Sequence, residues 1–312
     1  FMSDCLLLTA DADSFAAEIS RLADFPISIS ACTSADQALD AYRGQPVILG
    51  EPGMIATVLH KMPDIKWVQS TWAGVTPLIA CGRRDYVLTG VKGIFGPQMA
   101  EYALGYLLAH ELRVIERANA QRKHDWAHVP SGVLKGKCLG IMGTGSIGQH
   151  IAHTAASFGM RITGLNRTGA AVPGFDTVRS VDQLHAFLEE VNYLVSTLPQ
   201  TDATDNLLDT TALARLPRDA FLINVGRSNV VDDAALIEAL RNGNIAGAAL
   251  DVFTEEPLPS DSPLWETPNL TVTAHIAAIS HPALIAPVFI DNYRRYLKGQ
   301  RLRYVVDFDA GY

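Results

Sequence analysis

The sequence predicts an α/β protein built from two doubly wound parallel sheets, each covered by helices on both faces. In the first hundred residues, short apolar runs such as CLLLTA and PVILG alternate with amphipathic stretches, which is typical of βαβ units. A second series begins near residue 137, and its strands are continuous apolar runs, as expected for strands buried on both faces.

The length of 312 residues favours two domains. We expect residues 1–97 and 284–312 to form a discontinuous first domain of the flavodoxin-like type, and residues 98–283 to form a Rossmann-like second domain. The stretch 97–123 begins with proline and has an apolar face, so it predicts one long helix that links the two.

Composition excludes several classes of partner. The net charge of −8 argues against binding to nucleic acid or to an anionic membrane. The four cysteines are scattered, which favours reduced thiols over a disulfide framework. No apolar run reaches membrane-spanning length, and the first residues lack a basic segment with a cleavage site, so we expect a cytoplasmic protein.

The segment GIMGTGSIG carries the glycine pattern of a dinucleotide-binding turn. Gly143 permits the tight turn, Gly145 lets a pyrophosphate approach the backbone, and Gly148 allows the helix to pack on the strand. The pyrophosphate is expected at the helix N-terminus, beside the amides of Ser146 and Ile147. The strand before the glycines and the helix after them make this prediction stronger than the triplet alone.

The segment TGLNRTG indicates which dinucleotide. An Asp or Glu usually ends the second strand of this fold and binds the ribose hydroxyls of NAD. Here the position falls on Asn166, followed by Arg167 and Thr168, so no carboxylate would repel a 2′-phosphate. An amide, a guanidinium and a hydroxyl suit a phosphate, and we predict NADP(H). A solvated surface arginine is the alternative.

Three chemically active side chains follow strands of the second series. Arg227 follows FLINVG, Glu256 follows GAALDVF, and His275 closes LTVTAH. Ligands of open α/β sheets bind at the carboxyl edge, where such residues converge. Each alone has a structural explanation, but together beside a dinucleotide turn they predict an active site.

These segments resemble the D-isomer-specific 2-hydroxyacid dehydrogenases over nearly the full chain. The resemblance rests on the segments GTGSIG, LINVGRSNVVDDAALIEAL, GAALDVFTEEPLPSDSPLW and TAHIAA. Within the family, the chain is most similar to the NADPH-using glyoxylate/hydroxypyruvate reductases. It departs from the family pattern at Val225 and Gly226 before the arginine, at Ser228 after it, and at Ala274, where proline usually precedes the histidine.

The resemblance implies that a hydride from NADPH reduces a small 2-keto acid to the D-2-hydroxy acid. It makes His275 the general acid/base, Glu256 its partner and Arg227 the anchor of the substrate. It also implies a homodimer that forms through the cofactor domain. Further implied contacts are the substrate carboxylate on Ala73, Gly74 and Val75, and the cofactor on Leu198, Pro199, Thr204, Val225, Gly226 and Asp251.

Two alternatives stay open at this stage. One is an NAD-dependent D-2-hydroxyacid dehydrogenase of another substrate class, and the other is a non-catalytic, dinucleotide-sensing protein similar to a co-repressor. The histidine pairs in HIAH and HDWAH lack a third ligand, so we predict no metal site.

Overall fold

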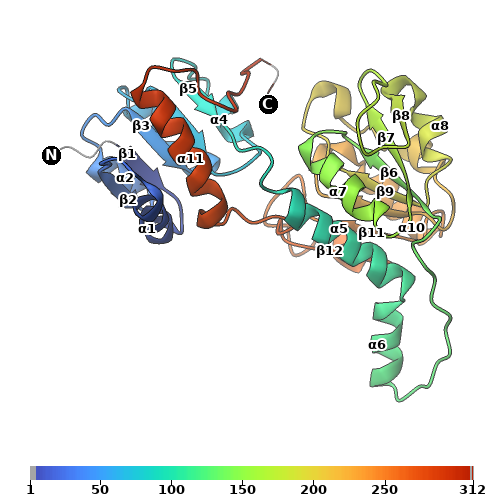
Figure 1. Cartoon of the computed structure of the whole chain (residues 1–312). Helices are drawn as coiled ribbons and strands as arrows, with labels where there is room; N and C mark the ends of the chain where they lie inside the picture. The colour runs from blue at the N-terminus through green and yellow to red at the C-terminus, as the bar shows by residue number, and fades with distance from the viewer. Residues whose placement is uncertain (1–4, 310, 312) are drawn as a thin grey trace. The chain divides into compact units, whose positions relative to one another are not determined.

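The computed structural model describes residues 5–309 and 311, which fall into two compact units. Unit 1 takes the chain up to Ile94 and from Ser280 onward, and unit 2 takes Phe95–Ile279. Each unit contains one parallel sheet, with five strands in unit 1 and seven in unit 2 among the described residues (Figure 1). The predicted fold class, two parallel-sheet α/β domains, is confirmed.

The sheet of unit 1 has the strand order β2-β1-β3-β4-β5, which is the flavodoxin-like order. Its strands are β1 (Cys5–Leu8), β2 (Ile29–Cys32), β3 (Val47–Gly50), β4 (Trp67–Ser70) and β5 (Val87–Thr89). Its helices are α1 (Ala12–Leu22), α2 (Ala35–Ala41), α3 (Pro52–Val58), α4 (Thr76–Ala80) and α11 (Pro282–Leu297).

The centre of this sheet requires a glycine. A Cβ on Gly50, at the end of β3, would lie 1.9 Å from the carbonyl oxygen of Leu8 on β1. The next residue, Glu51, accepts hydrogen bonds from the Thr9 hydroxyl at 2.7 Å and the Ala10 amide at 2.9 Å. The loops after β1 and β3 are therefore tied together at the carboxyl edge of the sheet.

Helix α11 brings the end of the chain back onto this sheet. The ring of Phe289 stacks on Trp67 of β4 with centroids 5.4 Å apart. The fully buried amide of Asn292 donates to Gln69 Oε1 and to the carbonyl of Arg303, both at 3.1 Å, and accepts from the amide of Arg303 at 2.7 Å. An aromatic stack and a buried polar network thus fix α11 to the strand that leads into the loop 71–75.

The sheet of unit 2 has the order β12-β11-β10-β9-β6-β7-β8, the Rossmann order with one further strand. Its strands are β6 (Cys138–Met142), β7 (Arg161–Asn166), β8 (Thr177–Ser180), β9 (Tyr193–Ser196), β10 (Phe221–Asn224), β11 (Gly247–Leu250) and β12 (Leu270–Val272). Its helices are α5 (Gly96–Glu111), α6 (Val114–Arg122), α7 (Ser146–Ala156), α8 (Leu184–Leu188), α9 (Thr210–Leu213) and α10 (Asp233–Arg241).

Helices cover both faces of this sheet. Side chains of α8, α9 and α10 join one buried cluster, and those of α5 and α7 join another. The central strands β6, β9, β10 and β11 are entirely buried, which explains why their sequences are continuous apolar runs and do not alternate.

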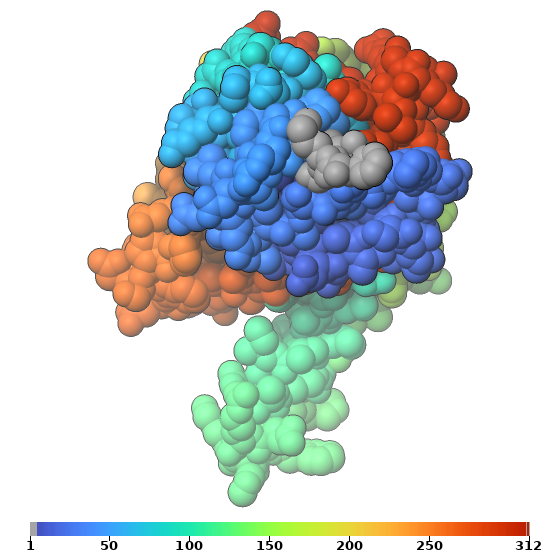
Figure 2. All heavy atoms as spheres, turned by 90° about the vertical axis from the view of Figure 1, so that its left-hand side faces the viewer, coloured from blue at the N-terminus to red at the C-terminus, as the bar shows by residue number. Residues whose placement is uncertain are grey.

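The prediction of one long helix over 97–123 is wrong. Helix α5 ends at Glu111, and α6 begins at Val114 after Arg113 adopts a left-handed φ of 51°. The side chain of Glu111 bonds the Tyr193 hydroxyl in the body of unit 2, while α6 leaves that body and has no buried residue. Figures 1 and 2 show α6 and the following loop as a projecting arm.

Candidate active site

The glycine turn of unit 2 has the geometry that a dinucleotide requires. Gly143 follows β6 with φ of +101°, and a Cβ on Gly148 would lie 2.0 Å from the Gly143 carbonyl oxygen, so both positions need glycine. A Cβ on Gly145 would meet nothing within 4 Å, so this glycine faces open space. No side chain caps α7, whose first amides at Ser146 and Ile147 remain available to an anion. These residues fit a pyrophosphate.

Residues that follow β9 and β10, including the predicted cofactor residues Leu198 and Gly226, lie beside this turn. The Thr197 hydroxyl after β9 donates to the Gly143 carbonyl at 3.1 Å. A Cβ on Gly226, after β10, would lie 2.6 Å from the carbonyl oxygen of Leu198. The Thr204 hydroxyl donates to the Pro199 carbonyl at 2.8 Å. The strands β6 and β9 are neighbours where the strand order reverses, which is where ligands of such sheets bind.

The loop after β7 shows what Asn166 does. Its amide nitrogen donates to the Thr144 hydroxyl at 3.1 Å and to the Ala170 carbonyl at 3.0 Å. Its amide oxygen accepts from the backbone of Thr168 at 3.1 Å and of Gly169 at 2.7 Å. Both amide hydrogens are thus used inside the protein. The side chain ties the loop 167–170 to the glycine turn, and a direct contact with the cofactor stays a prediction.

Arg167 and Thr168 are exposed on that loop. Arg167 forms no hydrogen bond or ion pair with any residue that the structure describes, which leaves its guanidinium available to a ligand. The Thr168 hydroxyl accepts from the Ala170 amide at 3.3 Å and keeps its own hydrogen to donate.

The catalytic candidates also converge. The Nδ1 atom of His275 lies 2.8 Å from Glu256 Oε2, and the other carboxylate oxygen accepts from the Phe253 amide at 2.9 Å. Arg227 interacts electrostatically with Glu256. Burial lowers the pKa of the Arg227 guanidinium below its usual value, and the Glu256 charge opposes this shift. Glu256 therefore interacts with both the imidazole of His275 and the guanidinium of Arg227.

Backbone geometry around Arg227 depends on Asn224, a residue that the sequence reading missed. Asn224 ends β10 and is buried. Its side chain donates to the Arg227 carbonyl at 3.0 Å and accepts from the Gly226 amide at 3.1 Å. The only available signal was a polar residue at the end of an apolar strand, and that signal does not reveal a partner.

Asp251 occupies a different environment from the one expected of a cofactor contact. The residue is 1% exposed, and its carboxylate accepts from the Thr273 hydroxyl and from the amides of Ile276 and Ala277. The structure therefore shows a role in holding the backbone beside His275. Contact with the nicotinamide stays a prediction.

In unit 1, the residues predicted to hold a substrate carboxylate follow β4. Ser70 closes a tight turn, since its hydroxyl donates to the Trp72 carbonyl at 2.8 Å and accepts from the Trp72 amide at 2.9 Å. The amides of Ala73, Gly74 and Val75 have no acceptor within the described part of the chain. Free consecutive amides suit a carboxylate, and the assignment stays a prediction.

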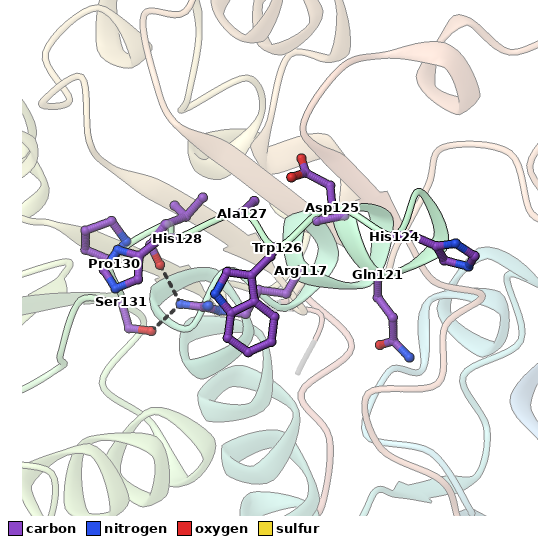
Figure 3. Close-up of a pocket in the computed structure, with 11 residues that line it drawn as sticks. Arg117, Gln121, His124, Asp125, Trp126, Ala127, His128, Pro130 and Ser131 are labelled. Atoms are coloured by element: carbon purple, nitrogen blue, oxygen red, sulfur yellow. Dashed lines mark hydrogen bonds between the residues drawn. The ribbon is translucent and has the colours of Figure 1, made fainter.

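A pocket of about 680 Å³ lies on the arm and not at these groups (Figure 3). Its wall includes Trp126, which is 95% exposed, and Arg117, which donates to the Ser131 hydroxyl at 2.7 Å and to the Val129 carbonyl at 2.8 Å. We do not assign the chemistry to it, because the pocket contains none of the strand-end residues. Within the described residues, no group of three or more His, Cys, Asp or Glu side chains is arranged to hold a metal.

Comparison with known families agrees with this geometry. Residues 104–277 match the model of the D-isomer specific 2-hydroxyacid dehydrogenase, NAD binding domain. The chain belongs to the D-isomer-specific 2-hydroxyacid dehydrogenase family. No described helix is long and apolar enough to cross a membrane.

Individual relatives are more specific. The chain is 33% identical over 217 residues to glyoxylate/hydroxypyruvate reductase A of Salmonella paratyphi B, which covers 70% of each protein. A solved family member from Aeromonas salmonicida is 39% identical, with a TM-score of 0.94 and coverage of 99% of this chain and 100% of the other. An NADPH-dependent glyoxylate/hydroxypyruvate reductase from Sinorhizobium meliloti, solved with NADP and sulfate, is 27% identical, with a TM-score of 0.88 and the same coverage.

Proposed function

We propose that this protein reduces a small 2-keto acid, of the glyoxylate or hydroxypyruvate class, to the D-2-hydroxy acid with NADPH. The observation that carries this proposal is the His275–Glu256 contact of 2.8 Å, together with the half-buried Arg227 that interacts with Glu256, on the same sheet as the glycine turn. A proton donor and a carboxylate anchor are the two protein groups that this reduction needs.

The coenzyme would lie along the carboxyl edge of unit 2 and would supply the hydride. Gly145 and the first amides of α7 would bind its pyrophosphate. Arg167 and Thr168 would bind the 2′-phosphate, because β7 ends in an amide where NAD-binding members of this fold carry a carboxylate. The S. meliloti relative, described as NADPH-dependent, supports the same choice.

The protein's own groups then have distinct tasks. His275 gives its Nε2 proton to the carbonyl oxygen of the keto acid, while Glu256 holds Nδ1 and fixes the orientation of the ring. Arg227 presents a planar guanidinium that matches a carboxylate and stabilises negative charge developing on the carbonyl oxygen. The amides of Ala73 to Val75 would bind the substrate carboxylate.

Steady-state kinetics test this proposal. NADPH oxidation would be followed with glyoxylate, hydroxypyruvate and bulkier 2-keto acids, for the natural chain and for His275→Ala. We expect the substitution to lower kcat about 10²- to 10⁴-fold, the usual contribution of a general acid. NADPH affinity, measured by fluorescence titration, should stay unchanged because His275 is not among the residues proposed to hold the coenzyme.

Two results would contradict the assignment. Natural turnover in the His275→Ala protein would remove the histidine from the mechanism. Tight NADPH binding without oxidation by any keto acid would instead indicate a dinucleotide-sensing protein.

We propose further that the arm forms a homodimer. Val114, Ile115, Trp126 and Val133 are exposed on α6 and the loop after it, an arrangement that commonly marks an association surface. Sedimentation of the natural chain and of Trp126→Ala would test this, since the substitution should favour the monomer. A natural chain that sediments as a monomer at micromolar concentration would contradict it.

We place the protein in the cytoplasm. The thiols of Cys32 and Cys138 are buried and take part in no disulfide, which suits a reducing compartment. Cell fractionation tests this placement, and recovery of the chain in an oxidising compartment would contradict it.

A further inference from the structure

A chain of hydrogen bonds connects α5 with the segment that carries His275, all within unit 2. The hydroxyls of Tyr102 on α5 and Thr273 lie 2.7 Å apart. Thr273 donates its hydrogen to Asp251 Oδ1 at 2.6 Å. Since a threonine hydroxyl has one hydrogen, Tyr102 must be the donor in the first contact.

Asp251 in turn holds three consecutive backbone amides. Its carbonyl oxygen accepts from the His275 amide at 2.9 Å. Its carboxylate accepts from Ile276 at 2.9 Å through Oδ1 and from Ala277 at 2.8 Å through Oδ2. Among the described residues, no other residue forms as many hydrogen bonds with the segment that follows Ala274.

The segment needs such support because His275 has a left-handed φ of 54°. This conformation is unfavourable for a residue with a side chain and persists only where surrounding contacts hold it. In this backbone conformation the imidazole contacts Glu256 at 2.8 Å. A group that fixes Asp251 therefore also fixes the catalytic ring.

We propose that Tyr102 and Thr273 are positioning residues for His275, acting through Asp251. The proposal rests on the proposed function, because it takes His275 as the proton donor. Neither residue has a described contact with the imidazole, so their effect on rate comes from geometry, to which proton transfer is sensitive.

The electrostatics agree with this arrangement. Burial raises the pKa of the Tyr102 hydroxyl, the hydrogen bond with Thr273 lowers it and the Asp251 charge raises it, and the net shift is upward. Tyr102 therefore keeps its proton throughout the neutral range and remains a donor. Burial, followed by the Asp251 charge, also raises the pKa of Tyr106, whose ring lies 4.7 Å from that of Tyr102.

Three variants isolate the hydroxyls. Tyr102→Phe and Thr273→Val each remove one hydroxyl with little change in shape, and Thr273→Ser restores it. Thr163→Val is the matched control, because Thr163 also lies in unit 2, is buried there, and its hydroxyl lies 2.9 Å from that of Thr177, with no described link to Asp251.

Hydrogen exchange by mass spectrometry is the first measurement and does not depend on activity. In Tyr102→Phe and Thr273→Val, amide exchange in residues 274–279 should be about 2- to 12-fold faster, as expected for the loss of one hydrogen bond. Thr273→Ser and Thr163→Val should leave this segment as in the natural chain.

Steady-state kinetics are the second measurement. Tyr102→Phe and Thr273→Val should lower kcat by about 5- to 100-fold through displacement of the ring, while KM for NADPH changes little. The solvent deuterium isotope effect on kcat should rise, because proton transfer becomes more strongly rate-limiting. Thr273→Ser should restore both values, and a purely structural role would not produce this pattern.

The outcomes separate this inference from the proposed function. Unchanged exchange at 274–279 in both variants, or faster exchange with natural kcat, would overturn the positioning role. If the natural chain reduces no keto acid, the proposed function and the catalytic part of this inference fail. The exchange result would then still decide whether Tyr102 and Thr273 hold the segment.

Discussion

Removing the guanidinium of Arg167 tests the choice of coenzyme most directly. Arg167 follows β7, is exposed, and has no partner among the described residues, so Arg167→Ala removes no contact that supports the fold. If this side chain binds the 2′-phosphate, the substitution should weaken NADPH and leave NADH nearly unaffected, because NADH has no phosphate there.

The size of the effect follows from the position of the side chain. A hydrogen bond to a charged group contributes about 1.5–3 kcal/mol. Unit charges 4 Å apart attract by about 1 kcal/mol in water and about 4 kcal/mol near a protein surface, a similar range. Since a tenfold change corresponds to about 1.4 kcal/mol, kcat/KM for NADPH should fall about 10- to 140-fold.

The same strand supplies a charge-matched control. Arg161 begins β7, and Arg167 follows its end, so the two are separated by about 20 Å at roughly 3.3 Å per residue. This exceeds twice the screening length of about 8 Å at physiological salt. Arg161→Ala removes the same charge, together with a 3.8 Å contact to Glu190, and should change neither coenzyme's kcat/KM by more than about twofold.

Initial rates with each coenzyme, at fixed keto acid and near-physiological salt, provide the measurement. An equal loss with NADPH and NADH in Arg167→Ala would show that the residue supports the loop and does not bind the phosphate. A natural chain that prefers NADH would refute the interpretation of residues 166–168 as a whole.

Three further predictions follow from the geometry. Gly145→Ala should weaken dinucleotide binding and leave Tm unchanged, because the added Cβ would enter open space where the pyrophosphate is proposed to lie. Gly148→Ala should lower both the affinity for the dinucleotide and Tm, because its Cβ would lie 2.0 Å from a carbonyl oxygen, with an overpacking cost of about 1–3 kcal/mol. Asn292→Ala should cost about 1–3 kcal/mol in urea unfolding, because two backbone groups of Arg303 lose their partner, and an unchanged midpoint would refute this. Burial lowers the pKa of His110, so between pH 6.5 and that lower value the unfolded chain binds more protons, and stability should decrease as the pH falls through this range. A pH series of unfolding midpoints that is identical in His110→Asn would contradict the last prediction.

The fold could be predicted because its signals are local. Apolar period, glycine and proline positions and strand length lie within windows of about ten to twenty residues. The break between α5 and α6 could not be predicted in this way, since no glycine or proline marks it. It coincides with a contact from Glu111 to Tyr193, which lies 82 residues further along the chain.

In the candidate site, too, local signals could be predicted from the sequence and long-range contacts could not. Arg227, Glu256 and His275 were identifiable because each follows a strand, and parallel strands bring their carboxyl ends to one edge. The hydrogen bonds of Asn166 and Asp251 were not identifiable. A carboxylate that binds a ligand and one that binds backbone amides look the same in a sequence.

The difference between binding a ligand and holding the backbone matters most at His275. The resemblance gives proline as the usual residue before the histidine, and proline restricts the backbone by its ring. This chain has Ala274 there, which leaves more freedom to a segment that must hold a left-handed residue. Contacts from other parts of unit 2 must then hold the segment, and Asp251 does so by accepting hydrogen bonds from three of its amides. Asp251 is in turn bonded to Thr273, and Thr273 to Tyr102. The partner that completes this network, Tyr102, lies 171 residues before Thr273, on a helix that no catalytic motif contains, so the proposed positioning of His275 could not be predicted from the motifs.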